Sequence, residues 1–119
     1  MPLFPTIDDI LEINKEVVKV TKEEHVVLSR GNIEYIVEKV FNNPNHIDNA
    51  ATYLHDIITV HPFLAGNKRT AFATTATYLA LNKLSFTASK LELEKLAYKC
   101  ARNEISYDKL RKLFRKIIK

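Results

Sequence analysis

The segment His61–Thr70, with the sequence HPFLAGNKRT, brings together residue types that suit the binding of an anion. Lys68 and Arg69 fall in the first turn of an expected helix. Each cation there opposes the positive end of the helix dipole, at a cost of about 0.3–1 kcal/mol unless an anion compensates. Gly66 allows a ligand to approach the backbone, and the free N–H groups at the helix start point toward the same space. The segment therefore predicts a loop that binds a phosphate or another oxyanion.

His61 stands at the other end of this loop and is the candidate for acid–base chemistry. An imidazole titrates near neutral pH and can take the proton of a hydroxyl nucleophile. Phe63 is the expected apolar anchor of the loop, and Asn67 is expected to turn the chain or to cap the next helix. Spacing alone leaves a second interpretation open, in which His61 only caps a helix and the two cations pair with acids elsewhere.

The loop is expected to join two helices of an all-α fold. Apolar residues recur at helical spacing along most of the chain, and Pro62 ends the helix before the loop, because a residue that precedes proline is disfavoured in the α conformation. The next helix has no charge from Thr70 to Asn82, which predicts a central buried helix. Six helices are expected, over about residues 7–20, 33–41, 47–60, 67–83, 90–100 and 108–117. The expected N-terminal caps are Thr6, Asn32, Ser89 and either Ser106 or Asp108.

The stretch around residues 22–30 breaks this helical pattern. The sequence TKEEHVVLSRG has some extended character at Val26–Leu28, which leaves room for a short β-hairpin flap. The chain has only 2 Gly and 4 Pro, too few for a turn-rich all-β fold, and no linker or repeat. We therefore expect a single domain over residues 1–119, built as a compact bundle of about six helices.

Composition and charge narrow the function classes. Hydrophobic residues make up 46% and charged residues 27%, as in soluble globular proteins. No stretch reaches the roughly 18 apolar residues of a membrane span. The start, MPLFPTIDDI, lacks the features of a signal peptide, so we expect a cytoplasmic protein and no membrane partner. Cys100 is the single cysteine, which excludes an intramolecular disulfide and favours a small core residue.

The charge balance gives only a mild indication of partners. The net charge is +4, and residues 109–119 carry six basic residues and no acid. Such an end is either a solvated helix face or a surface for an acidic partner. Nucleic acid is not expected, because no aromatic interleaving accompanies the basic residues. No metal ligands are expected either, since the four histidines share no ligand spacing: His25, His46, His55 and His61.

The loop also resembles the signature of the Fic/Doc family. The family motif reads H-P-F-x-(D/E)-G-N-G-R on a helical core, and the Doc (death-on-curing) branch has lysine in place of the second glycine. The matching residues are His61, Pro62, Phe63, Gly66, Asn67, Lys68 and Arg69, followed by Thr70 and Ala71 as is common in the Doc branch. Outside the motif the likeness is limited to the order of the helices.

The resemblance implies a role for each matching position. His61 would be the general base that activates a Ser, Thr or Tyr hydroxyl of a target protein. Backbone amides around Gly66 and Asn67 would form an anion hole, and Lys68 and Arg69 would bind ATP phosphates and stabilise the transition state. Phe63 and Thr70 complete the implied nucleotide-binding set. Residues 23–30 would be the flap that aligns the target by strand addition.

Lys68 also bears on the reaction that the resemblance implies. Lysine at this place is similar to the branch that transfers the γ-phosphate of ATP to a translation elongation factor and acts as a growth-arresting toxin. Transfer of AMP, as in members with glycine there, is the alternative. The family's self-inhibitory pattern, (S/T)-x-x-x-E-(G/N), does not occur in the sequence. An antitoxin protein that binds in trans is therefore implied.

Position 65 departs from the family pattern. Ala65 replaces the usual Asp or Glu, whose carboxylate helps to hold Mg²⁺ against the nucleotide. Magnesium often relies on substrate phosphates, so its binding can survive with fewer protein ligands, and Asp56 in the preceding helix is a candidate to help. The departure leaves a further alternative, a catalytically impaired module that only binds a nucleotide or a partner. Retention of His61 favours the enzyme, because a pure binder needs no base.

Overall fold

The computed structural model describes residues 4–119 and confirms an all-α fold. Residues 1–3 of the expected domain lie outside the described residues. The six helices are α1 (Ile7–Val20), α2 (Arg30–Phe41), α3 (His46–Val60), α4 (Asn67–Leu81), α5 (Lys90–Ala101) and α6 (Tyr107–Ile117). In the described part of the chain, no helix is long and apolar enough to cross a membrane.

Side-chain caps explain where most of these helices begin. The Thr6 hydroxyl accepts a hydrogen bond from the Asp9 N–H, and the Asp9 carboxylate accepts one from the Thr6 N–H. Ser89 and Ser106 cap α5 and α6 in the same general way, as the sequence predicts. The cap expected at Asn32 is wrong: the Ser29 hydroxyl accepts from the Asn32 N–H, so α2 begins three residues earlier. Gly31 lies within the first turn of this helix.

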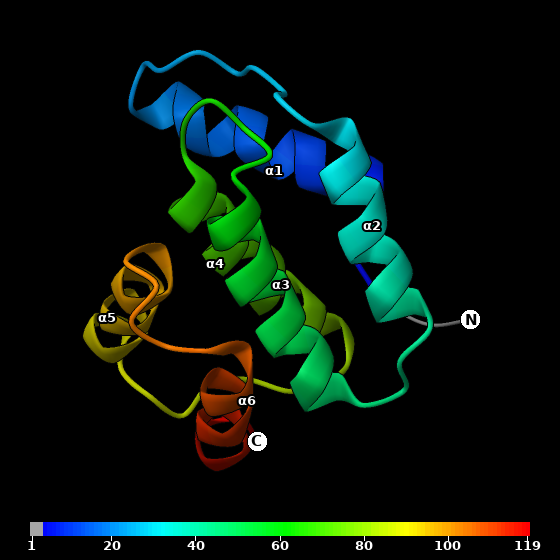
Figure 1. Cartoon of the computed structure of the whole chain (residues 1–119), viewed down its shortest axis with the longest axis vertical. Coiled ribbons are helices and arrows are strands. Elements are labelled where there is room, and N and C mark those ends of the chain that lie inside the picture. The colour runs from blue at the N-terminus through cyan, green and yellow to red at the C-terminus, as the bar shows by residue number, and fades with distance from the viewer. Residues whose placement is uncertain (1–3) are drawn as a thin grey trace.

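The antiparallel pair α3 and α4 forms the centre of the molecule, with α1 and α2 on one side and α5 and α6 on the other (Figure 1). The expectation of a single central helix at α4 is only partly confirmed. α4 buries one side, but Lys68, Thr77 and Leu81 are exposed. α3 contacts α2, α4, α5 and α6 and buries more of its length. The small residues of α4 suit close packing on α3, and α3 supplies more of the largest fully buried side chains than any other helix.

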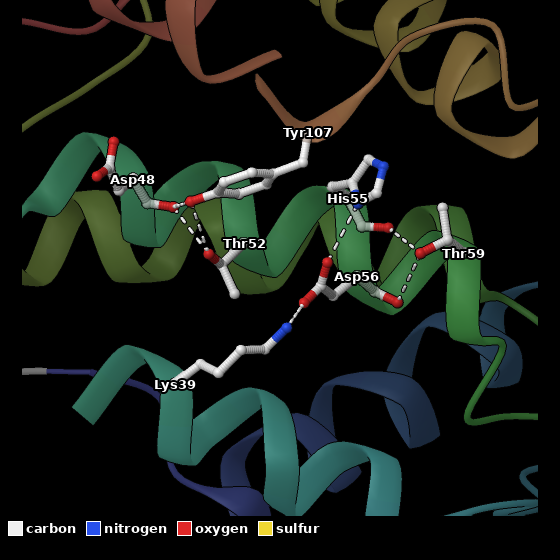
Figure 2. A network of polar contacts seen from close by, with 7 residues as sticks. All are labelled: Lys39, Asp48, Thr52, His55, Asp56, Thr59 and Tyr107. Atoms are coloured by element: carbon white, nitrogen blue, oxygen red, sulfur yellow. Dashed lines mark hydrogen bonds and ion pairs between the residues drawn. The ribbon is translucent and has the colours of Figure 1, made fainter. Parts of the chain in front are cut away.

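The face of α3 turned away from α4 carries a polar network (Figure 2). The Asp56 carboxylate accepts hydrogen bonds from Lys39 of α2 and from His55 Nδ1, the latter at 3.1 Å. The Tyr107 hydroxyl, at the start of α6, donates to the Asp48 carbonyl at 3.1 Å and accepts from Thr52 at 3.3 Å. The network therefore links α3 to α2 on one side and to α6 on the other.

The remaining expectations concern the loops and the cysteine. The expected hairpin near residues 22–30 does not form: within the described chain this segment makes one antiparallel bridge, between Val27 and Phe63. A second bridge joins Phe86 to Ile118 and holds the end of α6 against the loop before α5. Cys100 is buried in the core as expected, and burial raises the pKa of its thiol to about 11. A neutral, inert thiol follows from this placement.

Asp56 gives a prediction for stability against pH. Burial acts to raise the pKa of this carboxyl, but the hydrogen bonds from His55 and Lys39 outweigh it and hold the pKa below its ordinary value. The stabilisation is therefore present above the unfolded-state pKa of about 4 and is lost as the pH falls through the folded-state pKa. Asp56→Asn should lower the free energy of unfolding near neutral pH by about 1–2 kcal/mol. The free energy of unfolding of the variant should also fall less steeply as the pH is lowered. Urea denaturation at several pH values would measure this slope. If the free energy of unfolding of the variant fell as steeply in acid as that of the parent protein, Asp56 would not have this role.

Candidate active site

The loop between α3 and α4 begins at His61, whose backbone adopts the left-handed conformation with φ 49°. Asn67, the first residue of α4, closes the loop. Its Oδ1 accepts from the Phe63 N–H at 3.1 Å, and its Nδ2 donates to the Phe63 carbonyl at 2.9 Å. Phe63 itself is buried in the core, as expected. Asn67 therefore holds the turn and does not cap the helix, whose cap position is Gly66.

His61 is oriented by the same asparagine. The ring is exposed, and its Nδ1 lies 3.2 Å from Asn67 Nδ2. The two bonds to Phe63 fix the orientation of the amide, so Nδ2 is the donor and His61 Nδ1 accepts. The neutral imidazole then carries its proton on Nε2.

A buried asparagine of α1 ties the loop to its surroundings. Asn14 is 0% exposed, and its Nδ2 donates to the Ala65 carbonyl at 2.9 Å and to the Thr70 hydroxyl at 3.0 Å. Its Oδ1 accepts from His25 Nδ1 at 2.8 Å. One side chain thus joins α1 to the loop, to α4 and to the segment between α1 and α2.

Gly66 is required by geometry on two counts. Its φ is 77°, in the left-handed region that favours glycine. A Cβ here would lie 2.9 Å from Val18 Cγ1 and 3.2 Å from Val17 Cγ2, so the loop packs directly on α1. The sequence suggests that Gly66 makes room for a ligand, but its missing side chain makes room for α1.

A hollow of about 670 Å³ opens beside the first turn of α4. α4 is the one helix of the described six whose cap residue gives no side-chain hydrogen bond, so its first N–H groups are available to an anion. A stripe of α5 forms the opposite wall. The lining residues are Glu23, Gly66, Asn67, Lys68, Arg69, Phe72, Lys90, Glu94, Ala97 and Tyr98.

The two cations of the loop differ in their surroundings. Lys68 is exposed, and its Nζ lies 5.5 Å from the centre of the Tyr98 ring. It has no ion pair within residues 4–119. Arg69 instead points toward the end of α1. Its guanidinium donates to the Val17 carbonyl at 2.9 Å and to the Glu23 carboxylate at 2.6 Å. Lys68 is thus ready to meet an anion, whereas Arg69 is already paired.

Glu23 is held in place as a partner of Arg69. Its carboxylate also accepts a hydrogen bond from the Thr21 hydroxyl, and Thr21 accepts from Arg69 at 3.1 Å. The hydrogen bonds from Thr21 and Arg69 lower the pKa of Glu23, so the pair keeps its charge in moderately acidic solution. The interpretation in which the loop cations pair with acids elsewhere therefore holds for Arg69 and not for Lys68.

The segment before α2 lies along the loop as an extended chain. Leu28 N–H donates to the Pro62 carbonyl at 2.8 Å, and Leu64 N–H donates to the Val26 carbonyl at 3.0 Å. Because successive residues of an extended chain face opposite sides, the N–H and C=O of Val27 point away from the loop. Val27 and Leu28 are also exposed. The outer edge of this segment can accept another strand.

Most of the predicted site residues come together, and two of them play a supporting part. Gly66, Asn67, Lys68 and Arg69 line the hollow, with His61 linked to it through Asn67. Phe63 and Thr70 lie in the core beneath the loop. Reasoning from the sequence missed Asn14, although a polar residue between Ile10 and Val18 on the apolar stripe of α1 was a detectable signal. It also missed the wall residues of α5, which no local motif marks.

The described residues provide few candidate ligands for a metal ion. They contain no group of three His, Cys, Asp or Glu side chains placed to hold one. Ala65 has no carboxylate, and both oxygens of Asp56 are engaged by Lys39 and His55 (Figure 2). Asp56, the candidate to assist a metal, is thus already engaged by two partners, and its assistance to a metal stays a prediction. The donors present do not fit a protein-held Mg²⁺.

A comparison with protein families agrees with this site. The model of the Fic/DOC family matches residues 4–79, which include α1 to α3, the loop and nearly all of α4. The chain therefore belongs to the Fic/DOC family. Members of this family are typically transferases that modify other proteins. A search among curated proteins gave no match. The match ends before α5, so the far wall of the hollow lies outside it.

The contrast between the two glycines gives a prediction for stability. Gly66→Ala should lower the free energy of unfolding by roughly 2 kcal/mol or more, because the left-handed backbone and the contact with Val18 both disfavour a Cβ. Gly31→Ala should instead raise it by up to about 1 kcal/mol, since Gly31 lies in the first turn of α2 with open space around it. Urea denaturation of the two variants would measure both changes. Equal effects would show that the loop does not depend on close packing against α1.

The pairing of Arg69 gives a prediction for anion binding. Glu23→Gln removes the charge that competes for Arg69, so an anion such as inorganic pyrophosphate should bind up to about fivefold more tightly, as expected for an exposed ion pair. Glu24→Gln is the matched control, because it changes the net charge equally and Glu24 is not among the hydrogen-bond and ion-pair partners of Arg69. Isothermal titration calorimetry with pyrophosphate measures the affinity of both variants. If the two variants bind alike, long-range charge and not the ion pair determines affinity.

Proposed function

We propose that this protein is a Doc-like toxin of a toxin–antitoxin pair. In the cytoplasm it transfers the γ-phosphate of ATP to a hydroxyl of a target protein, a translation elongation factor, and so arrests growth. The observation that carries the proposal is Lys68, an unpaired cation on the wall of a hollow next to the uncapped N-terminus of α4. The hollow, at about 670 Å³, is large enough for a nucleotide.

The arrangement supports one order of events in the reaction. His61 takes the proton of the target hydroxyl, whose oxygen attacks the γ-phosphorus. The bond from that phosphorus to the oxygen shared with the β-phosphate then breaks, and ADP leaves. Lys68 and the first N–H groups of α4 stabilise the negative charge on the phosphate oxygens. Arg69 joins them once it leaves Glu23, and Phe63 and Thr70 hold the loop in shape.

His61 must change its hydrogen bonding to act as the base. In the free protein Nδ1 accepts from Asn67, and Nε2 holds the proton of the neutral ring. Turning the ring so that a nitrogen lone pair meets the target hydroxyl breaks one hydrogen bond at 3.2 Å. Such a neutral bond contributes only about 0.5–1.5 kcal/mol, so binding of the target can supply this energy.

The open edge at Val27 suits alignment of the target. A peptide that adds to this edge as a strand would run beside the loop that carries His61. Main-chain hydrogen bonds would then fix the position of the hydroxyl, and the sequence of the peptide would matter less. An antitoxin is proposed to restrain the enzyme in trans.

Two alternatives use the same site. AMP transfer uses the same base and the same anion site, and only the direction in which ATP lies would differ. A module that binds without catalysis is favoured by Ala65 and by the poor fit to Mg²⁺. Because no carboxylate at the loop can hold that ion, any magnesium in the reaction would be carried by the nucleotide phosphates.

The test is to incubate the purified protein with a cell extract and either γ-labelled or α-labelled ATP. We expect a labelled protein band from the γ position only, and at least about a hundredfold less label with His61→Ala, because a general base contributes on that scale. Circular dichroism of the variant would show that it is folded. Label from the α position would establish AMP transfer instead. ATP binding without label from either position would establish the binding module.

A second pair of variants separates alignment of the target from binding of ATP. Val27→Pro removes the N–H on the outer edge, so it should reduce labelling of the target while ATP binding stays unchanged. Val27→Thr keeps that N–H and an extended-chain preference, and it should label normally. Normal labelling by Val27→Pro would contradict strand addition at this edge.

A further inference from the structure

Charge is distributed unevenly between the two sides of the molecule. Residues 61–119 hold 13 of the 18 basic residues and 4 of the 14 acidic ones, so they carry a net charge of +9, and residues 1–60 carry −5. In space, α5 and α6 lie on one side of the central pair, and α1 and α2 lie on the other (Figure 1). Residues 82–119, which contain α5 and α6, hold 11 of these basic residues and all 4 of the acids, so this side alone carries a net charge of +7, whereas the whole chain carries +4.

The outer face of α6 concentrates this charge around one apolar side chain. Lys109, Lys112, Leu113 and Lys116 follow the spacing of a single helical stripe, and all four are exposed, Leu113 to 37%. The opposite face of α6, with Leu110 and Phe114, is buried in the core. The stripe is therefore a surface for contacts outside the chain.

Acidic residues near this stripe do not neutralise it. Glu104 lies 4.0 Å from the Arg102 guanidinium, and Asp108 lies 3.3 Å from that of Arg111. Among the described residues none of the lysines of the stripe has an ion pair, and the same holds for Lys99 of α5. The nearby acids are paired with arginines, which leaves the lysines open.

A groove of about 320 Å³ runs between this stripe and the end of α5. Ile105 and Leu113 form an apolar floor, and the lysines lie around it. The lining residues are Lys99, Glu104, Ile105, Lys109, Lys112 and Leu113. This surface, which we term the α5–α6 groove, lies outside the part of the chain that the family match covers.

We propose that the α5–α6 groove binds an acidic amphipathic helical segment of another protein. A leucine or similar side chain of the partner would rest on Ile105 and Leu113, and its carboxylates would face the lysines. The charged backbone of RNA would gain nothing from contact with the apolar side chains of the groove. The described residues that line the groove also include no aromatic side chain on which a base could stack. A membrane is disfavoured because the apolar face of α6 is buried. The inference does not depend on the proposed reaction.

The probe is a synthetic helical peptide of about 14 residues, roughly four turns, with glutamates flanking two leucines on one face. Its binding to the full chain is measured by fluorescence anisotropy. A short RNA duplex and anionic lipid vesicles are tested in parallel. We expect the peptide to bind more tightly than a peptide of the same composition with its sequence scrambled.

Charge-reversal variants test whether the groove is the site. Lys109→Glu with Lys112→Glu should weaken peptide binding by at least about tenfold, through lost attraction and added repulsion. Lys15→Glu with Lys19→Glu on α1 is the matched control, since both lysines are exposed and the charge change is equal. Leu113→Ser, which changes no charge, should weaken binding about threefold or more if the apolar floor takes part. Circular dichroism checks that each variant is folded.

Several outcomes would overturn the proposal. Equal weakening by the two lysine pairs would indicate attraction by net charge alone. Binding of RNA or vesicles that depends on Lys109 and Lys112, without binding of the peptide, would assign the groove to another class of partner. Self-association in sedimentation experiments that depends on the same lysines would assign it to the acidic side of a second copy.

Discussion

The amide of Asn14 is the interaction on which the site depends. It is completely buried, and its donors and acceptor are used by the loop, by α4 and by the segment before α2. An unpaired buried polar group costs about 1–3 kcal/mol, so loss of any one of these partners would destabilise the fold by about that amount. The contact between Gly66 and Val18 adds a steric constraint at the same place. Together they fix the path of the backbone that carries His61 at one end and Lys68 at the other.

Local sequence signals predicted much of this architecture. Thr6, Ser89 and Ser106 cap their helices as expected, and Pro62 ends α3. The loop was recognisable as a candidate anion site because two cations in the first turn of a helix are unfavourable unless an anion compensates them. The start of α2 was misjudged, because Asn32 is a favourable cap residue but Ser29, three residues earlier, caps the helix. Helical spacing also could not show that α3, rather than α4, contacts most of the other helices.

What the sequence could not predict is decided by contacts between distant segments. Arg69 and Glu23 are 46 residues apart, and Lys68 meets Tyr98 across the hollow. The segment 22–30 has the extended character that its valines indicate, but it pairs with the loop and not with itself. The apolar floor between the lysines of α5 and α6 likewise arises only when these two helices come together.

The ion pair between Arg69 and Glu23 has a consequence for how two ligands would influence each other. Glu23 lies at the start of the extended segment that contains Val27. Arg69, which lines the hollow, therefore also restrains the open edge of this segment through its ion pair with Glu23. In the proposed function, a phosphate that drew Arg69 away from Glu23 would release that restraint. By thermodynamic linkage, whatever occupancy of the hollow does to the affinity of the edge, occupancy of the edge does equally to the affinity of the hollow. If both proposed sites bind their ligands, they would act as one coupled receptor, in which the order of binding changes the rates but not the final affinities.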